Sequence, residues 1–213
     1  PAILRVLDTI SDRAPVMANR THEVIRAFFN WCVDRGYIES SPAAGIKPPA
    51  VEKSRDRVLT PGELFEVWNV TESLGYPLGS FLKFLVLTAQ RRGEVATMRW
   101  KDVDLEKAIW TLPAEVTKSS RVHDVPLSKA AMEILTAKDE KGNFKVPRFT
   151  KGDYIWTTTS GEKAINGFSK SKDRIDVATM AARKKAGIKK NIPSWTMHDI
   201  RRTASTHMAG AGV

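Results

Sequence analysis

The sequence predicts an α+β fold that is mainly α-helical, with a small β-hairpin or sheet, in a chain of two parts. Apolar residues recur at helical spacing through most of the chain, and two short stretches near its middle alternate as strands do. A proline-rich, charged and aperiodic stretch separates the first 46 residues from the rest. The chain has 213 residues, 42% of them hydrophobic and 27% charged, which is a globular composition.

Residues 1–46 are expected to contribute two helices. Helical spacing covers residues 3–14, and a stronger helix is expected from about Asn19 to Arg35, ending at Gly36. The single cysteine, Cys32, has apolar neighbours and is expected to be a small buried residue. Two helices cannot bury all their own apolar residues. We therefore interpret residues 1–46 as the C-terminal part of a helical domain, and residues 47–58 as an interdomain linker.

Residues 59–213 are expected to form a second domain. Thr60, Pro61 and Glu63 have the order of a capping-box helix start. The stretch 81–87 is apolar nearly all round, which predicts a helix at the centre of the core. Residues 108–112 and 122–127 are the two expected strands. The polar turn between them places Lys118 at or near the tip of a hairpin.

The remainder of this domain is expected to be mostly helical. Ser128 should begin a helix that includes Leu135, and Tyr154-Ile155-Trp156 suggests a short strand. A long basic helix is expected from Phe168 to about Ala186.

The positive charge is concentrated beyond residue 50. Residues 1–50 hold six Lys and Arg and five Asp and Glu, which leaves 28 basic and 19 acidic residues of the totals of 34 and 24 for residues 51–213. This excess favours a polyanionic partner, with nucleic acid ahead of an acidic membrane. The alternative is ordinary solubility charge.

Near the C-terminal end, His198 and Arg201 stand three residues apart. On a helix that begins at Ser194 or Thr196, they would share a face and could reach one ligand. An always-charged guanidinium beside an imidazole suits the binding of a phosphate and the transfer of a proton. The alternative is charge on a solvated helix surface.

Together with two further motifs, this pair resembles the tyrosine recombinase, or phage integrase, family. Residues 88–94, Thr-Ala-Gln-Arg-Arg-Gly-Glu, match the family's T-G-x-R-x-G-E box, with Ala89 in place of glycine, a small-for-small change expected to be tolerated. Lys118 and the Val-Pro-Leu-Ser of residues 125–128 match its β-hairpin. Residues 198–203, His-Asp-Ile-Arg-Arg-Thr, match its H-x-x-R box. The three motifs occur in the family's order and the resemblance extends over nearly the whole chain.

The resemblance implies a tyrosine-recombinase catalytic domain preceded by part of a helical core-binding (SAM-like) domain. It implies that Arg91 and Arg201 stabilise the charge on the non-bridging phosphate oxygens of DNA. Lys118 would act as the general acid, and His198 would bind the phosphate or assist proton transfer. Glu94, Asp199 and Thr203 would support these residues. The basic residues expected to contact DNA are Lys170, Lys172, Arg174 and Arg202.

The remaining expectations concern partners and location. The partner is double-stranded DNA, with a homotetramer on paired sites for the full-length protein. No cofactor is needed, and no histidine or cysteine spacing predicts a metal site. No secretory signal and no apolar run of ~20 residues is visible, so membrane insertion is not expected. A cytoplasmic, nucleoid-associated protein of a bacterial cell or phage is expected.

The family's nucleophile, a tyrosine that follows the second box, has no match here. The tyrosines are Tyr37, Tyr76 and Tyr154, and all precede Arg201. We therefore expect a fragment of an integrase that binds DNA weakly and cannot cleave it. The alternatives are a catalytically inactive DNA-binding or regulatory protein of the same fold, a type IB topoisomerase, and an unrelated phosphate-handling enzyme. For Arg91 alone, the alternative is a surface ion pair with Glu94, and for Lys118 it is a solvated turn.

Overall fold

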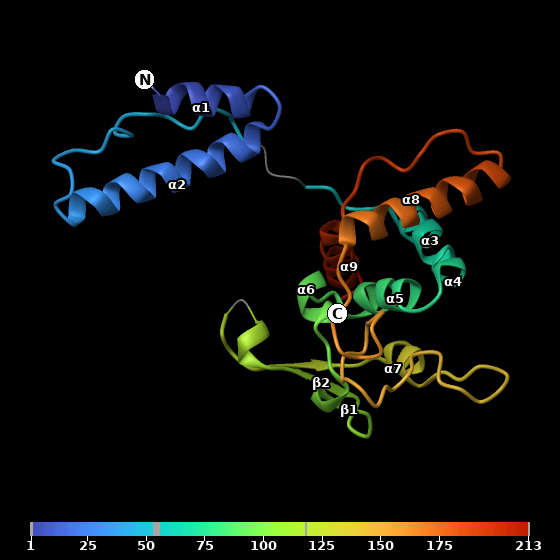
Figure 1. Cartoon of the computed structure of the whole chain (residues 1–213). Helices are drawn as coiled ribbons and strands as arrows, with labels where there is room; N and C mark the ends of the chain where they lie inside the picture. The colour runs from blue at the N-terminus through green and yellow to red at the C-terminus, as the bar shows by residue number, and fades with distance from the viewer. Residues whose placement is uncertain (1, 53–55, 118, 213) are drawn as a thin grey trace. The chain divides into compact units, whose positions relative to one another are not determined.

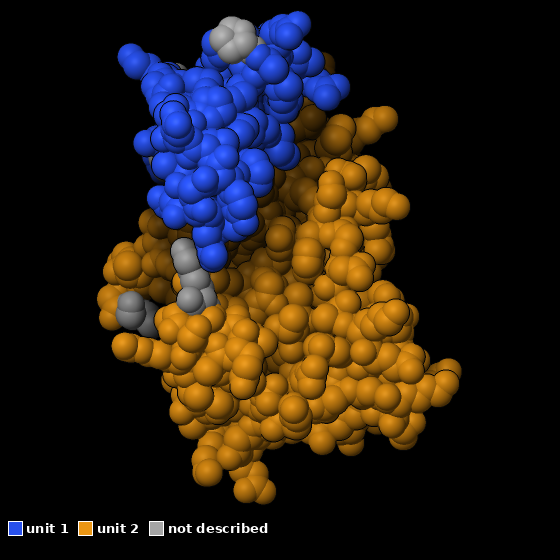
Figure 2. All heavy atoms as spheres, turned by 60° about the vertical axis from the view of Figure 1, so that its left-hand side comes forward, with its two compact units in different colours: residues 1–56 blue, residues 57–213 orange. Residues whose placement is uncertain are grey.

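The computed structural model describes residues 2–52, 56–117 and 119–212. The chain divides into two compact units, Pro1–Asp56 and Arg57–Val213, coloured separately in Figure 2. The assignment of the first as part of a core-binding domain stays a prediction.

Unit 1 contains helices α1 (Ala2–Ser11) and α2 (Pro15–Asp34), which pack on each other, and Leu7 of α1 and Ala18 of α2 are buried. Helix α2 begins at Pro15, four residues before the predicted start. Proline is tolerated in the first turn of a helix because the N–H that it lacks would have no helical partner there. Cys32 is buried, as predicted.

The start of the predicted linker is fastened to α2. The side-chain amide of Asn19 donates to the carbonyl of Ala50 at 2.8 Å and accepts from its N–H at 3.0 Å. The His22 ring lies 2.9 Å from the Ile46 carbonyl, and both side chains are buried. Residues 46–50 are therefore part of unit 1, held by polar side chains that their local sequence pattern does not reveal.

Unit 2 is mainly helical with one small antiparallel sheet, which confirms the predicted fold class (Figure 1). Its α-helices are α3 (Pro61–Asn69), α4 (Thr71–Leu74), α5 (Leu78–Thr88), α6 (Arg92–Ala96), α7 (Lys129–Thr136), α8 (Phe168–Lys185) and α9 (Met197–Gly210). Two 3-10 turns, η1 (Trp100–Asp102) and η2 (Ala114–Val116), flank strands β1 (Val103–Asp104) and β2 (Ile109–Leu112), and β3 is His123–Pro126. The strand order is β1-β2-β3, with Trp110 opposite Val125.

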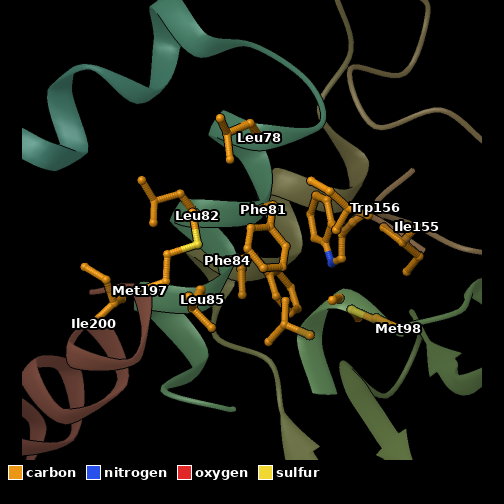
Figure 3. Close-up of a cluster of buried hydrophobic side chains, with 14 of the residues drawn as sticks. Leu78, Phe81, Leu82, Phe84, Leu85, Met98, Ile155, Trp156, Met197 and Ile200 are labelled. Atoms are coloured by element: carbon orange, nitrogen blue, oxygen red, sulfur yellow. The ribbon is translucent and has the colours of Figure 1, made fainter. Parts of the chain in front are cut away.

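Helix α5 is the centre of the core, as its apolar sequence predicts. Phe81 and Phe84 are fully buried, and both contact Trp156 edge-on or tilted, with ring centroids 6.1 and 5.4 Å apart. On another side of α5, Met197 and Ile200 of α9 lie against its leucines (Figure 3). The helix that carries the predicted His198 and Arg201 is therefore packed directly on the core.

The predicted strand at residues 154–156 is wrong in part. Tyr154 makes one isolated bridge with Arg99, and no strand is formed there within the described chain. Ile155 and Trp156 are both fully buried. Their apolar character therefore marks core burial rather than a ladder of strand hydrogen bonds.

None of the helices that the structure describes is both long enough and apolar enough to cross a bilayer.

Candidate functional site

Arg91 stands at the start of α6, immediately after the chain leaves the core helix α5. Helix α5 ends at Thr88, and Ala89 takes the left-handed conformation, with φ 50° and ψ 22°. This sharp turn brings Arg91 to the N-cap position of α6. The first box thus forms a tight connection between the buried α5 and an arginine whose side chain is 45% exposed.

Glu94 holds Arg91 in place from within the core. Its side chain is only 4% exposed. One carboxylate oxygen accepts from the Arg91 backbone N–H at 2.9 Å, and the other accepts from Arg91 Nη1 at 2.7 Å. The ion pair that would be the ordinary explanation for Arg91 therefore exists, and it fixes the direction of the guanidinium. The supporting role that the family resemblance implies for Glu94 stays a prediction.

Helix α9 begins with a similar arrangement. The Thr196 N–H donates to the Asp199 carboxylate at 2.8 Å, and its hydroxyl donates to the same oxygen at 3.0 Å. Arg202 donates to the other oxygen of Asp199, which is 2% exposed, at 3.4 Å. Of the two predicted caps, Thr196 is the N-cap residue.

Helices α6 and α9 bring the two box arginines to the same carboxylate. Arg201 Nη1 lies 3.8 Å from Glu94 Oε2, which is beyond hydrogen-bond distance. That nitrogen is buried and has no hydrogen-bond partner within the described residues. Burial lowers the pKa of Arg201, the positive charge of Arg91 lowers it further, and Glu94 partly opposes both.

The charges at this site do not balance. One carboxylate serves two guanidinium groups that are always protonated, so a net positive charge remains in a partly buried place. A buried N–H without an acceptor is costly unless something binds it. An anion with several oxygens, such as a phosphate diester, would accept from Arg201 and reduce its repulsion with Arg91.

Of the other two predicted catalytic residues, His198 and Lys118, the structure describes only His198. His198 is exposed on α9, one turn before Arg201. Lys118 lies outside the described residues. Thr203 is completely buried, and its hydroxyl accepts from the Leu59 N–H at 2.9 Å. Within the described residues no group of three or more His, Cys, Asp and Glu could hold a metal ion.

The four basic residues predicted to contact DNA differ in their environments. Lys170 and Arg174 are exposed on α8. Lys172, by contrast, pairs with Asp176 and lies 4.1 Å from the centre of the Trp195 ring. Arg202 is half-buried and bonded to Asp199. Lys170 and Arg174 are thus available for an external phosphate, whereas Lys172 and Arg202 have structural contacts.

The tyrosines of unit 2 have structural roles. Tyr76 donates to the Ile155 carbonyl at 2.8 Å, and burial raises its pKa to about 12. The Tyr154 hydroxyl accepts from Arg99 at 2.8 Å, and the guanidinium also lies over the Tyr154 ring. The raised pKa of Tyr76 leaves less of its hydroxyl ionised near neutral pH, which makes it a poorer nucleophile.

His207 is a residue to which the sequence analysis assigns no role. Its ring Nε2 lies 3.0 Å from the Leu59 carbonyl, 148 residues away in the chain. No local pattern signals a contact of that separation.

Comparison with known proteins identifies the family. The phage integrase family model matches residues 57–213, which is all of unit 2. Prophage integrase IntZ of Escherichia coli K12 is 30% identical over 62% of this chain and 34% of its own length. The integrase of Salmonella phage P22 is 27% identical over 94% of this chain and 49% of its own. The chain thus spans between a third and a half of these two relatives.

The fold is shared with solved integrases. Lambda integrase, crystallised as a tetramer bound to a Holliday junction, superposes with a TM-score of 0.66 at 21% identity, over 96% of this chain and 57% of that one. The Tn1549 transposon integrase in complex with a circular intermediate DNA gives 0.70 at 13% identity, over 97% of this chain and 71% of that one. With a family model that matches most of its residues and the integrase fold around its two box arginines, the chain belongs to the phage integrase family of tyrosine recombinases.

Proposed function

We propose that this chain carries the phosphate-binding part of a site-specific DNA recombinase, which integrates or excises the DNA of a mobile element. The observation that carries the proposal is that Arg91 and Arg201 share the carboxylate of Glu94, while the buried Arg201 Nη1 has no hydrogen-bond partner among the residues that the structure describes. Two guanidinium groups with donors to spare match the two non-bridging oxygens of a phosphodiester.

In the proposed reaction, Arg91 and Arg201 bind the scissile phosphate and stabilise the charge that develops on it. A tyrosine oxygen attacks the phosphorus, the bond to the 5′-oxygen breaks, and a 3′-phosphotyrosine forms. The departing 5′-oxygen takes a proton from Lys118, and His198 hydrogen-bonds the phosphate or assists that transfer. The tyrosine belongs to the full recombinase at a position after Arg201. In this chain every tyrosine precedes Arg201.

The proposed partner is duplex DNA, and the proposed assembly is a homotetramer on paired sites in the full recombinase. Support comes from the basic excess beyond residue 50, and from lambda integrase, which was crystallised as a tetramer on a Holliday junction. The 213-residue chain itself is expected to bind DNA and form no covalent product.

The test uses the full recombinase and duplexes with the junction sequences of its own mobile element, each nicked so that a cleaved strand cannot be rejoined. A covalent protein–DNA adduct that survives denaturation is expected with the unaltered protein. Arg91→Ala and Arg201→Ala should each lower its rate at least 100-fold, in the range for loss of a transition-state donor. Arg99→Ala is the control, because Arg99 is occupied by Tyr154 and should leave the adduct in place.

Three outcomes would contradict the proposal. Site-specific binding without an adduct would identify a DNA-binding or regulatory protein of this fold. Relaxation of supercoiled DNA without strand exchange between paired sites would identify a topoisomerase. An adduct formed by the 213-residue chain would show that one of Tyr37, Tyr76 and Tyr154 is the nucleophile.

A further inference from the structure

Two side chains of α9 hold the backbone of Leu59 between them. The Leu59 N–H donates to Thr203 Oγ1 at 2.9 Å, and the His207 ring Nε2 lies 3.0 Å from the Leu59 carbonyl. A carbonyl only accepts, so this ring nitrogen carries the hydrogen. Thr203 and His207 are one helical turn apart, and both Thr203 and Leu59 are completely buried. One residue thus has both of its backbone polar groups satisfied by the same helix.

The residues on both sides of Leu59 are held by hydrogen bonds and an ion pair. Leu59 precedes Thr60, whose hydroxyl accepts from the Glu63 N–H at 3.2 Å while its N–H donates to the Glu63 carboxylate at 2.8 Å. On the other side of Leu59, Arg57 Nη1 donates to the Val58 carbonyl at 2.6 Å, and Arg57 Nη2 forms an ion pair with Glu63 at 2.7 Å. The start of unit 2 is therefore held by contacts within residues 57–63 that do not involve α9.

We propose that Thr203 and His207 are positioning residues, which set the place of Arg201 along and around α9 relative to Glu94 and Arg91. This inference rests on the proposed function, because it concerns how Arg201 is held at the phosphate site. The apolar contacts of Met197 and Ile200 bury one side of α9, and hydrophobic contacts are non-directional. Hydrogen bonds are directional, so the two hydrogen bonds to Leu59 define the position of α9 along its axis.

The site is sensitive to such a shift. Arg201 already lies 3.8 Å from Glu94, beyond hydrogen-bond distance, and one residue of sliding moves a helix by about 1.5 Å. Thr203 follows Arg201 by two residues, so the two side chains leave α9 in roughly opposite directions. The contact with Leu59 is therefore on the side of α9 opposite to Arg201, which faces the Glu94 carboxylate.

The test measures binding of inorganic phosphate to the 213-residue chain, which needs no nucleophile. The NMR signals of the arginine Nε–H groups report binding at each guanidinium, with assignment from Arg91→Lys and Arg201→Lys. Thr203→Val keeps the shape and removes the acceptor, and His207→Leu removes the donor. Each should weaken phosphate binding roughly three- to tenfold, the range for a lost hydrogen bond. Thr206→Val, an exposed threonine of α9, is the matched control and should change nothing.

A double-mutant cycle separates positioning from mere stabilisation. In an Arg201→Ala background, Thr203→Val and His207→Leu should cause no further loss of phosphate affinity, since they act through Arg201. Thr203→Ser keeps the hydroxyl and His207→Gln keeps a donor, so both should restore affinity. Hydrogen exchange at the Leu59 amide checks that Thr203→Val has removed the bond. If Thr203→Val does not fold, His207→Leu and His207→Gln carry the same comparison.

The outcomes distinguish this inference from the proposed function. If the unaltered chain binds no phosphate, or binds it independently of Arg91 and Arg201, the proposed function fails. If binding depends on both arginines but not on Thr203 or His207, only the positioning inference fails. It also fails if the losses in the double-mutant cycle simply add, because the two residues would then act without Arg201.

Discussion

At the scale of single residues, Glu94 sets the arrangement of the two arginines at the proposed phosphate site. Both of its oxygens accept hydrogen bonds from Arg91, and Arg201 approaches the same carboxylate. A carboxylate can accept at both oxygens, whereas an amide accepts at one and donates at the other. The charge of Glu94 is therefore only part of its role, because its acceptor pattern also matters.

Glu94→Gln should lower the free energy of unfolding by about 1–3 kcal/mol, the cost of leaving a buried donor facing another donor. Urea denaturation with an unchanged m-value would measure it. Glu162→Gln, at an exposed position, is the control and should stay within about 0.5 kcal/mol of the unaltered chain. Equal stability of the two variants would mean that Glu94 is not a required acceptor.

Ala89 shows what the first box requires at its second position. The sequence suggests that one small residue replaces another, but the structure shows that the backbone angle matters more than size. With φ 50° and ψ 22°, Ala89 is left-handed, which costs an L-residue about 1–2 kcal/mol. Glycine reaches this conformation without the penalty.

Ala89→Gly should therefore stabilise the chain by about 0.5–1 kcal/mol, since the relief of strain exceeds the extra freedom of the unfolded chain. Thermal denaturation would detect the rise in Tm. Ala130→Gly, on the exposed side of α7, should have the opposite sign and lose about 0.5–1 kcal/mol. A loss of stability in both variants would contradict the strain at Ala89.

At the scale of elements, the contact between α4 and α5 depends on the absence of a side chain at Gly79. A Cβ built on Gly79 would lie 2.0 Å from the Thr71 carbonyl oxygen and 3.0 Å from its carbon. Both atoms are backbone, so they cannot turn away as a flexible side chain would. Gly79 is the point at which the short helix α4 crosses the core helix.

Gly79→Ala should cost about 1–3 kcal/mol or more, because α4 and α5 must move apart. Gly62→Ala, in helix α3 with nothing within 4 Å of its Cβ position, is the matched control. It should gain up to about 1 kcal/mol from the higher helix propensity of alanine. Chemical denaturation of both variants checks the contrast, and equal effects would rule out the close contact as the cause.

Local patterns predicted most of the helical elements but not the contacts between them. The apolar run of α5, the capping box at Thr60 and the helix start at Ser128 are all confirmed, because each depends on neighbours within a few residues. The attachment of His207 to Leu59 joins residues 148 positions apart. The prediction of a strand at Tyr154 was wrong in part, because apolar residues indicate burial both in strands and in segments that form no strand.

The sequence motifs predicted which residues belong to the candidate site but not how these residues contact one another. The two box arginines could be named from the sequence, since the motifs give residue types in order. That Glu94 lies between both guanidinium groups depends on how α6 packs against α9, which no motif states. Likewise, Lys172 looks the same in the sequence as Lys170, and only the fold shows its contact with Trp195.

At the scale of the whole molecule, the basic excess should appear in how DNA binding responds to salt. Each lysine or arginine on a phosphate displaces counterions, so the logarithm of the binding constant falls linearly with the logarithm of salt concentration. The basic residues of α8 differ in exposure. Lys170 and Arg174 are exposed, whereas the side chain of Lys172 is 17% exposed and paired with Asp176.

We expect a steep salt dependence for the 213-residue chain on duplex DNA, measured by fluorescence anisotropy. Lys170→Gln and Arg174→Gln should each make the slope shallower by about 1, because each removes roughly one phosphate contact. Lys172→Met should instead lower thermal stability and leave the slope unchanged, since its charge is already used within the protein. A Lys172→Met slope as shallow as that of Lys170→Gln would show that DNA draws Lys172 away from Asp176. A flat response of the unaltered chain would contradict phosphate contacts as the basis of binding.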